Sequence, residues 1–196
     1  MGLAILIFGL VLFLGTHVFV TARGRRAALL ADWGDARYKL LFSLLSAIGL
    51  VLIVYGFGQY RSAGYIPVWD PPRWTRHVAA LLVLLAVIFL FAAYLPGHIK
   101  RALKHPMLAG VKLWAVAHLL ANGDLGSIIL FGSFLAWAVY ARIAAKRRER
   151  AGEALRPVPV SGWRNDVVAV AVGVLVYLGL GFVFHPLLIG VPAFSG

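Results

Sequence analysis

The chain has 196 residues, of which 62% are hydrophobic and 13% are charged, and its mean hydropathy is +0.88. This composition excludes a soluble globular domain and indicates an integral membrane protein. The net charge of +12 does not indicate nucleic-acid binding, because the cytoplasmic loops of membrane proteins are themselves enriched in Lys and Arg. The absence of cysteine excludes disulfides, iron–sulfur clusters, thiolate-ligated haem and covalently attached haem.

Six apolar stretches have about the length that crosses a bilayer as a helix. They cover residues 3–20, 40–60, 77–97, 106–122, 125–141 and 167–188, and the fourth is interrupted by Lys112. Continuous apolar runs of this length are unlike the alternating strands of a membrane barrel. We therefore predict an all-α membrane protein, with a single domain over residues 1–196 built as a bundle of about six transmembrane helices.

The basic residues between these stretches predict the orientation of the chain. If the N-terminus faces away from the cytoplasm, 15 Lys and Arg residues of the loops fall inside and only three fall outside. This asymmetry follows the positive-inside rule. The most basic loop, RIAAKRRERAGEALR from Arg142, then lies in the cytoplasm, and both termini are non-cytoplasmic.

Two of the six histidines lie within apolar stretches, where an ionisable side chain is costly and points to a function. These are His17 and His118. The others are expected at the ends of spans or in a short inner loop, where an imidazole can reach water; they are His77, His98, His105 and His185.

The surroundings of His118 suit a flat ligand such as haem. Trp114 lies one turn before His118 and Asn122 one turn after it, on the same helical face. Lys112 can extend toward the inner headgroups or meet a haem propionate. The alternative is that the imidazole only hydrogen-bonds a neighbouring helix.

His17 follows Gly9 and Gly15, and small residues allow a helix or a planar macrocycle to approach closely. The same alternative, a hydrogen bond to a neighbouring helix, applies to this histidine. His17 lies near the inner end of its span, whereas His118 lies about 18 Å from the inner end of its own. A tilt of the first helix would reduce that difference in depth.

The stretch HPMLAGVKLWAVAHLLANGD, which begins at His105, resembles the NnrU family of bacterial inner-membrane proteins, as does GTHVFVTARGRRAALLADWGDARYKLLFSLLSAIGLVLIVYGF, which begins at Gly15. That family is associated with nitrite and nitric oxide reduction, which is denitrification metabolism. The chain also resembles the related plant 15-cis-zeta-carotene isomerase, in which histidines bind b-type haem. The resemblance implies non-covalent haem b with His17 and His118 as ligands. A cysteine of the isomerase corresponds here to Ala115.

Three alternatives remain open from the sequence. The first is a haem isomerase acting on a carotenoid-like polyene. The second is a methyltransferase, since KHPMLAG around His105 is similar to the motif by which isoprenylcysteine methyltransferases bind S-adenosylmethionine, and Glu149 and Glu153 follow the fifth span. The third is a cofactor-free accessory protein of a nitrite or nitric oxide reductase.

Overall fold

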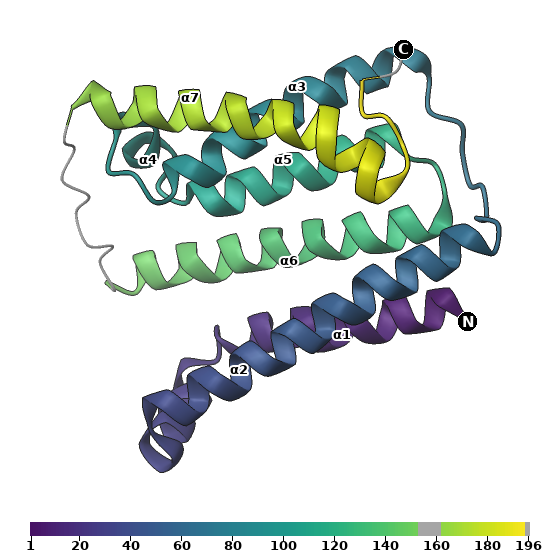
Figure 1. The fold of residues 1–196 in the computed structure, drawn as a ribbon. Coiled ribbons are helices and arrows are strands. Elements are labelled where there is room, and N and C mark those ends of the chain that lie inside the picture. The colour runs from purple at the N-terminus through teal and green to yellow at the C-terminus, as the bar shows by residue number, and fades with distance from the viewer. Residues whose placement is uncertain (153–161, 195–196) are drawn as a thin grey trace. The chain divides into compact units, whose positions relative to one another are not determined.

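The computed structural model describes residues 1–152 and 162–194. Within these residues every secondary-structure element is a helix (Figure 1). An all-α fold is therefore confirmed. In chain order the elements are α1 (Gly2–Phe19), α2 (Arg23–Ser62), α3 (Arg73–Ala92), α4 (His98–Leu103), α5 (Pro106–Ala121), α6 (Leu125–Arg150), α7 (Trp163–Gly179) and the π-helix η1 (Leu180–Ile189).

All six predicted spans are helical, and five helices are long and apolar enough to cross a membrane. Those five are α1, α2, α3, α6 and the continuous helix formed by α7 and η1. The protein is therefore a multi-pass membrane protein whose environment is a lipid bilayer. The remaining helix, α5, has 16 residues and rises about 24 Å, which is less than the roughly 30 Å of a hydrocarbon core.

The ends of the helices differ from the predicted spans where local chemistry intervenes. Helix α3 ends at Ala92 instead of residue 97, because the residue before Pro96 is driven out of helical conformation. Helix α6 continues past its apolar part to Arg150. The short helix α4 has no apolar period long enough to reveal it in the sequence.

Contacts divide the chain into two compact units, which are described separately below. Unit 1 comprises Met1–Trp69 and Asp124–Trp137, and unit 2 comprises Asp70–Gly123 and Ala138–Gly196. The first half of α6 therefore belongs to unit 1 and the second half to unit 2.

In unit 1, α1 and α2 run antiparallel and touch through glycines. A methyl group on Gly9 would lie 2.7 Å from the backbone nitrogen of Ile53, and one on Gly49 would lie 2.8 Å from that of Phe13. These distances leave no room for a side chain. Gly2 and Gly56 make equally close contacts further along the same seam, so the two backbones pack directly against each other.

In unit 2, α3 packs against α5 and α7 through small residues. A methyl group on Gly110 would lie 2.8 Å from the carbonyl oxygen of Ala86, and one on Gly173 would meet Ile88 of α3 at the same distance. Six of the eight buried hydrophobic residues of these helices are alanines. Close helix approach at small residues therefore organises this unit as well.

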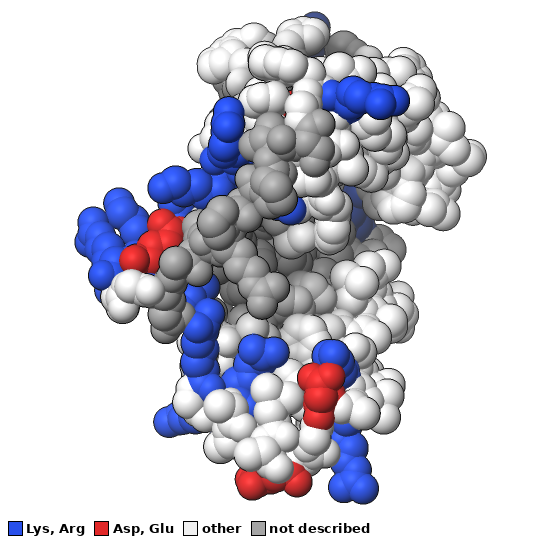
Figure 2. All heavy atoms as spheres, turned by 90° about the vertical axis from the view of Figure 1, so that its left-hand side faces the viewer, with Lys and Arg blue, Asp and Glu red and all other residues white. Residues whose placement is uncertain are grey.

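Loops that the sequence places on one side of the membrane lie together within each unit. In unit 1, the amide of Leu125 donates to the carbonyl oxygen of Ile66 at 2.9 Å, and Pro67 pairs with Asp124. In unit 2, the loop around α4 contacts the end of α6 and the start of α7, as described below. Figure 2 faces this end of unit 2, where Lys and Arg predominate over Asp and Glu.

Helix α2 is interrupted at Gly34, whose φ of 77° and ψ of 161° are not helical. This region of backbone conformation is accessible almost only to glycine. The kink separates the segment from Arg23 to Trp33 from the long apolar part of α2, so the first segment can turn back toward α1.

We expect Gly34→Ala to lower the free energy of unfolding by about 1–3 kcal/mol, because alanine is strained in this conformation. Gly24→Ala is the matched control: Gly24 is in the same segment, has open space at its Cβ position and has no positive φ. It should be neutral or stabilise the helix by up to about 1 kcal/mol. Titration of the protein in mild detergent with dodecyl sulfate measures the free energy of unfolding of both variants. Equal changes in the two variants would contradict the non-helical backbone at Gly34.

Candidate functional site

His17 lies near the end of α1 in a pocket of aromatic rings within unit 1. Its ring stacks on Phe13, with the ring centroids 4.3 Å apart. Phe42 lies 5.3 Å away, and Trp137 lies 5.8 Å away with its plane perpendicular to the imidazole. The imidazole is therefore enclosed mainly by apolar ring surface.

The hydrogen bond of His17 fixes which ring nitrogen carries the proton. Nδ1 lies 2.7 Å from the backbone carbonyl oxygen of Phe13, one turn earlier in the same helix. A carbonyl only accepts, so Nδ1 carries a hydrogen, and in a neutral ring the lone pair is then on Nε2. The partner belongs to α1 itself, so this bond does not join His17 to a neighbouring helix.

The pocket around His17 also contains a polar group that has no hydrogen-bond partner among the described residues. The indole nitrogen of Trp137 is buried and has no hydrogen-bond partner among the described residues. Buried N–H groups are normally paired. This indole N–H is therefore available to donate to a polar group of a bound molecule beside His17.

His118 repeats the arrangement of His17 within unit 2. Its Nδ1 lies 2.8 Å from the carbonyl oxygen of Trp114, again one turn earlier in the same helix, so Nε2 again carries the lone pair. The Trp114 ring lies 5.1 Å from the imidazole. The side-chain nitrogen of Asn122 donates to the carbonyl oxygen of His118 at 2.9 Å, and the same oxygen accepts from the backbone amide of Asn122 at 3.0 Å.

His185 is a neighbour of His118 that reasoning from the sequence did not pair with it. The two ring centroids are 6.3 Å apart. His185 lies in η1, just before Pro186, and π-helical segments are frequent at functional sites. Only the proline inside an apolar stretch marks this irregularity in the sequence, because π-helical pairing has no period that composition reveals.

The structure thus brings together Trp114, His118 and Asn122, as the helical spacing predicts, and adds His185. Lys112 is half-buried on the same helix, and its amino group has no hydrogen bond or ion pair among the described residues. His17 belongs to unit 1. No group of three or more metal-ligating side chains occurs in the described parts of the chain.

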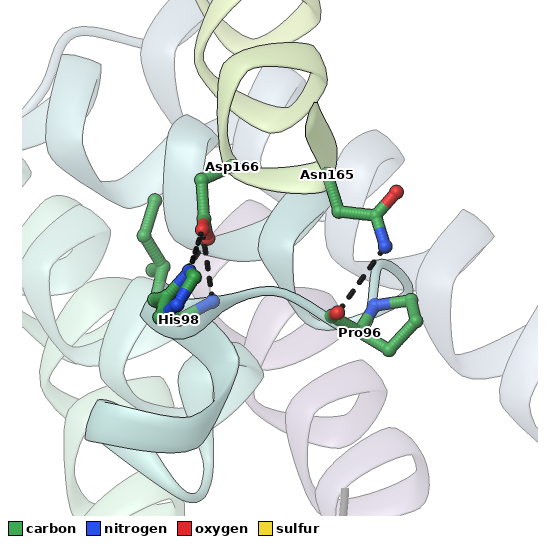
Figure 3. A network of polar contacts seen from close by, with 5 residues as sticks. Pro96, His98, Asn165 and Asp166 are labelled. Atoms are coloured by element: carbon green, nitrogen blue, oxygen red, sulfur yellow. Dashed lines mark hydrogen bonds and ion pairs between the residues drawn. The ribbon is translucent and has the colours of Figure 1, made fainter. Parts of the chain in front are cut away.

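A polar cluster at the basic end of unit 2 holds His98 (Figure 3). The Asp166 carboxylate accepts hydrogen bonds from the backbone amides of His98 and Ile99, both at 2.9 Å, and from Nδ1 of His98 at 2.8 Å. Asn165 donates to the carbonyl oxygen of Pro96 at 3.2 Å. His98 is therefore bound to α7, and not simply hydrated as the sequence predicts.

The packing at Asp166 is tight and explains Gly97. A methyl group on Gly97 would overlap the Asp166 carboxylate, and Trp163 stacks on His98 with ring centroids 4.3 Å apart. Asp166 precedes the apolar stretch of α7. Hydrogen bonding from the Ile99 amide, and then from His98, holds the pKa of this carboxyl below its usual value.

His105 joins the start of α5 to the end of α6. Its Nε2 lies 2.8 Å from the Glu149 carboxylate, which also accepts from Arg142 at 3.1 Å. Arg142 and Glu149 lie beyond the apolar part of α6. Hydrogen bonding to His105, followed by the charge of Arg142, lowers the pKa of Glu149. Glu153, the other acidic residue of this motif, lies outside the described residues.

We expect Asp166→Asn to lower the midpoint of thermal unfolding at neutral pH, because an amide cannot accept all three hydrogen bonds. Since the folded pKa of Asp166 is depressed, its contribution to stability is present above the unfolded value of about 3.9 and is lost as the pH falls below it. The variant and the parent protein should therefore converge in acid.

Asp35→Asn is the control for this experiment. Asp35 pairs with Lys39 one turn away, and both side chains are largely exposed. Such pairs contribute little to stability. A loss as large as that of Asp166→Asn would contradict the assigned role of the Asp166 cluster.

The profile of the family described as NnrU protein matches residues 5–193, which is nearly the whole chain and includes every residue of the two histidine environments. No curated protein and no solved structure matches the chain. The chain belongs to the NnrU family.

Proposed function

We propose that this membrane protein binds one b-type haem, with His17 and His118 as axial ligands, and supports nitrite and nitric oxide metabolism in a bacterial inner membrane. The observation that carries the proposal is the matched state of the two imidazoles. Each bonds Nδ1 to a carbonyl of its own helix, which leaves the lone pair on Nε2. Histidines that ligate metals commonly donate their second ring nitrogen in this way.

The donor set fits non-covalent haem. The chain has no cysteine, so imidazole is its strongest available axial ligand, and haem iron needs only two protein ligands because the porphyrin supplies the other four. Haem supplies one-electron chemistry or the binding of a small gas. The residues of this chain fix the ring orientations and keep water from the apolar surroundings.

Other side chains suit the edges of the same group. Trp114 offers a flat aromatic surface beside His118, and Asn122 holds the final turn of α5. The amino group of Lys112 can meet a propionate, and the unpaired indole N–H of Trp137 can donate to a polar edge near His17. The partner that fits this role is a nitrite or nitric oxide reductase system, served by electron transfer, sensing or assembly.

The isomerase alternative is less well supported by the same residues. Ala115, at the position of the isomerase cysteine, is completely buried and has no sulfur. Exchange of a histidine ligand for a thiolate is therefore not available to this chain. We assign the haem a role that needs no such exchange.

The absorption spectrum of the purified protein tests the proposal. Two imidazole ligands give a six-coordinate, low-spin b haem with sharp bands on reduction. His17→Ala and His118→Ala should each give high-spin or lost haem, and added imidazole should partly restore the low-spin spectrum. The exposed His77 is the control, since His185 lies too near His118 to serve as one.

Two results would overturn this proposal. A colourless protein from haem-replete cells would remove the cofactor. Haem whose spectrum is unchanged in both His17→Ala and His118→Ala would show that other residues hold it, and a change in His185→Ala alone would identify a different ligand.

The methyltransferase alternative makes a separate prediction. It requires S-adenosylmethionine to bind in a manner that depends on His105. We expect no binding by calorimetry, because the His105 ring nitrogen is already bonded to Glu149 and thereby has a structural role. Saturable binding that disappears in His105→Ala would favour the methyltransferase.

A further inference from the structure

An apolar groove lies in unit 1, along the face of α1 that carries Phe8, Gly15 and Phe19. Phe42, whose ring centroid is 5.3 Å from that of His17, is one of its walls. The volume of the groove is about 410 Å³, within the range of ligand sites. Side chains from Phe8 to Phe19 line it along α1, Leu29 and Trp33 line it from the segment before the α2 kink, and Tyr38 lines it after the kink. The kink at Gly34 thus places two parts of α2 around one groove.

The groove has about the depth of one bilayer leaflet. From Phe8 to Phe19, α1 rises by about 16 Å, and half of a hydrocarbon core is about 15 Å. Gly15 lies in the middle of this face, and a methyl group there would meet open space. An extended acyl chain fits such a groove in length and in polarity.

Two buried polar atoms near the groove lack partners. The hydroxyl of Tyr38, a residue that is only 8% exposed, has no hydrogen-bond partner among the described residues, and neither does Nε of Arg26. The Arg26 guanidinium carbon lies 5.5 Å from the centre of the Tyr38 ring, so the two groups are neighbours. Buried donors without acceptors are rare in proteins, and both of these groups donate.

Charge at this end of unit 1 favours an anion. Arg23 and Arg25 accompany Arg26 at the start of α2, which the distribution of basic residues places in the cytoplasm. Trp33 is 44% exposed, as is usual for an aromatic residue at a membrane interface. Basic segments at the cytoplasmic surface attract anionic lipids.

We infer that unit 1 binds one anionic phospholipid of the cytoplasmic leaflet, independently of any haem. The acyl chain occupies the groove beside Gly15. The phosphate accepts hydrogen bonds from the Tyr38 hydroxyl and the Arg26 guanidinium. The phospholipid thus supplies hydrogen-bond acceptors to the Tyr38 hydroxyl and to Nε of Arg26, and its acyl chain covers the apolar side chains of the groove.

Native mass spectrometry of the full-length protein, released from nanodiscs of equal phosphatidylglycerol and phosphatidylcholine, tests the inference. We expect one retained phosphatidylglycerol per chain in preference to phosphatidylcholine. Gly15→Leu should remove it by filling the groove, whereas Gly58→Leu, also at a glycine with open space, should not. Inorganic phosphate should not displace the lipid, because the acyl chain contributes to binding.

Headgroup recognition is tested by two conservative changes. Tyr38→Phe and Arg26→Gln should each reduce retention by about fivefold, roughly the effect of one headgroup contact. Their controls are Tyr55→Phe, at an exposed position of the same helix, and Arg76→Gln, at an exposed arginine of α3 outside this basic segment.

The following outcomes would overturn the inference. Equal retention of the two lipids would exclude a phosphate-specific site. Undiminished retention in Gly15→Leu would place the lipid elsewhere, and loss of a dimer in that variant without loss of lipid would assign the groove to a second copy of the chain. Effects in Tyr38→Phe and Arg26→Gln no larger than in their controls would exclude these headgroup contacts.

Discussion

Direct contact between helix backbones is the constraint on which this structure depends. Lipid is as apolar as leucine, so burying apolar side chains does not drive membrane helices together, and close packing at small residues must do so. The seam of α1 and α2 shows this at Gly9 and Gly49, where any side chain would meet backbone atoms. Because the seam fixes one face of α1, it determines that His17 faces an aromatic pocket and that Gly15 faces a groove.

The same apolar surroundings explain the arrangement of the polar side chains. His17 and His118 each form a hydrogen bond through Nδ1 to a backbone carbonyl of their own helix. One ring nitrogen of each imidazole is therefore paired within the protein. Carboxylates appear at the helix ends, where Asp166 and Glu149 each bind a histidine. The histidines with carboxylate partners have a structural explanation, whereas the two within apolar stretches are the ligands in the proposed haem site.

Much of the fold was predictable because apolar length and loop charge are properties of the sequence itself. All six predicted stretches are helices, and the shared face of Trp114, His118 and Asn122 follows from helical spacing. The bond between His98 and Asp166 was not predictable, since 68 residues separate them. The proximity of His185 to His118 depends on a π-helix, and the groove depends on the backbone of Gly34, neither of which has a sequence period.

The central claim is that two imidazoles from separate parts of the chain hold a single haem iron. Low-temperature electron paramagnetic resonance of the oxidised protein, with haem and protein quantified in the same sample, tests it most directly. The account predicts one haem per chain and a low-spin ferric signal with nitrogen couplings from two imidazoles. A high-spin axial signal, coupling to one imidazole only, or two haems per chain would contradict it.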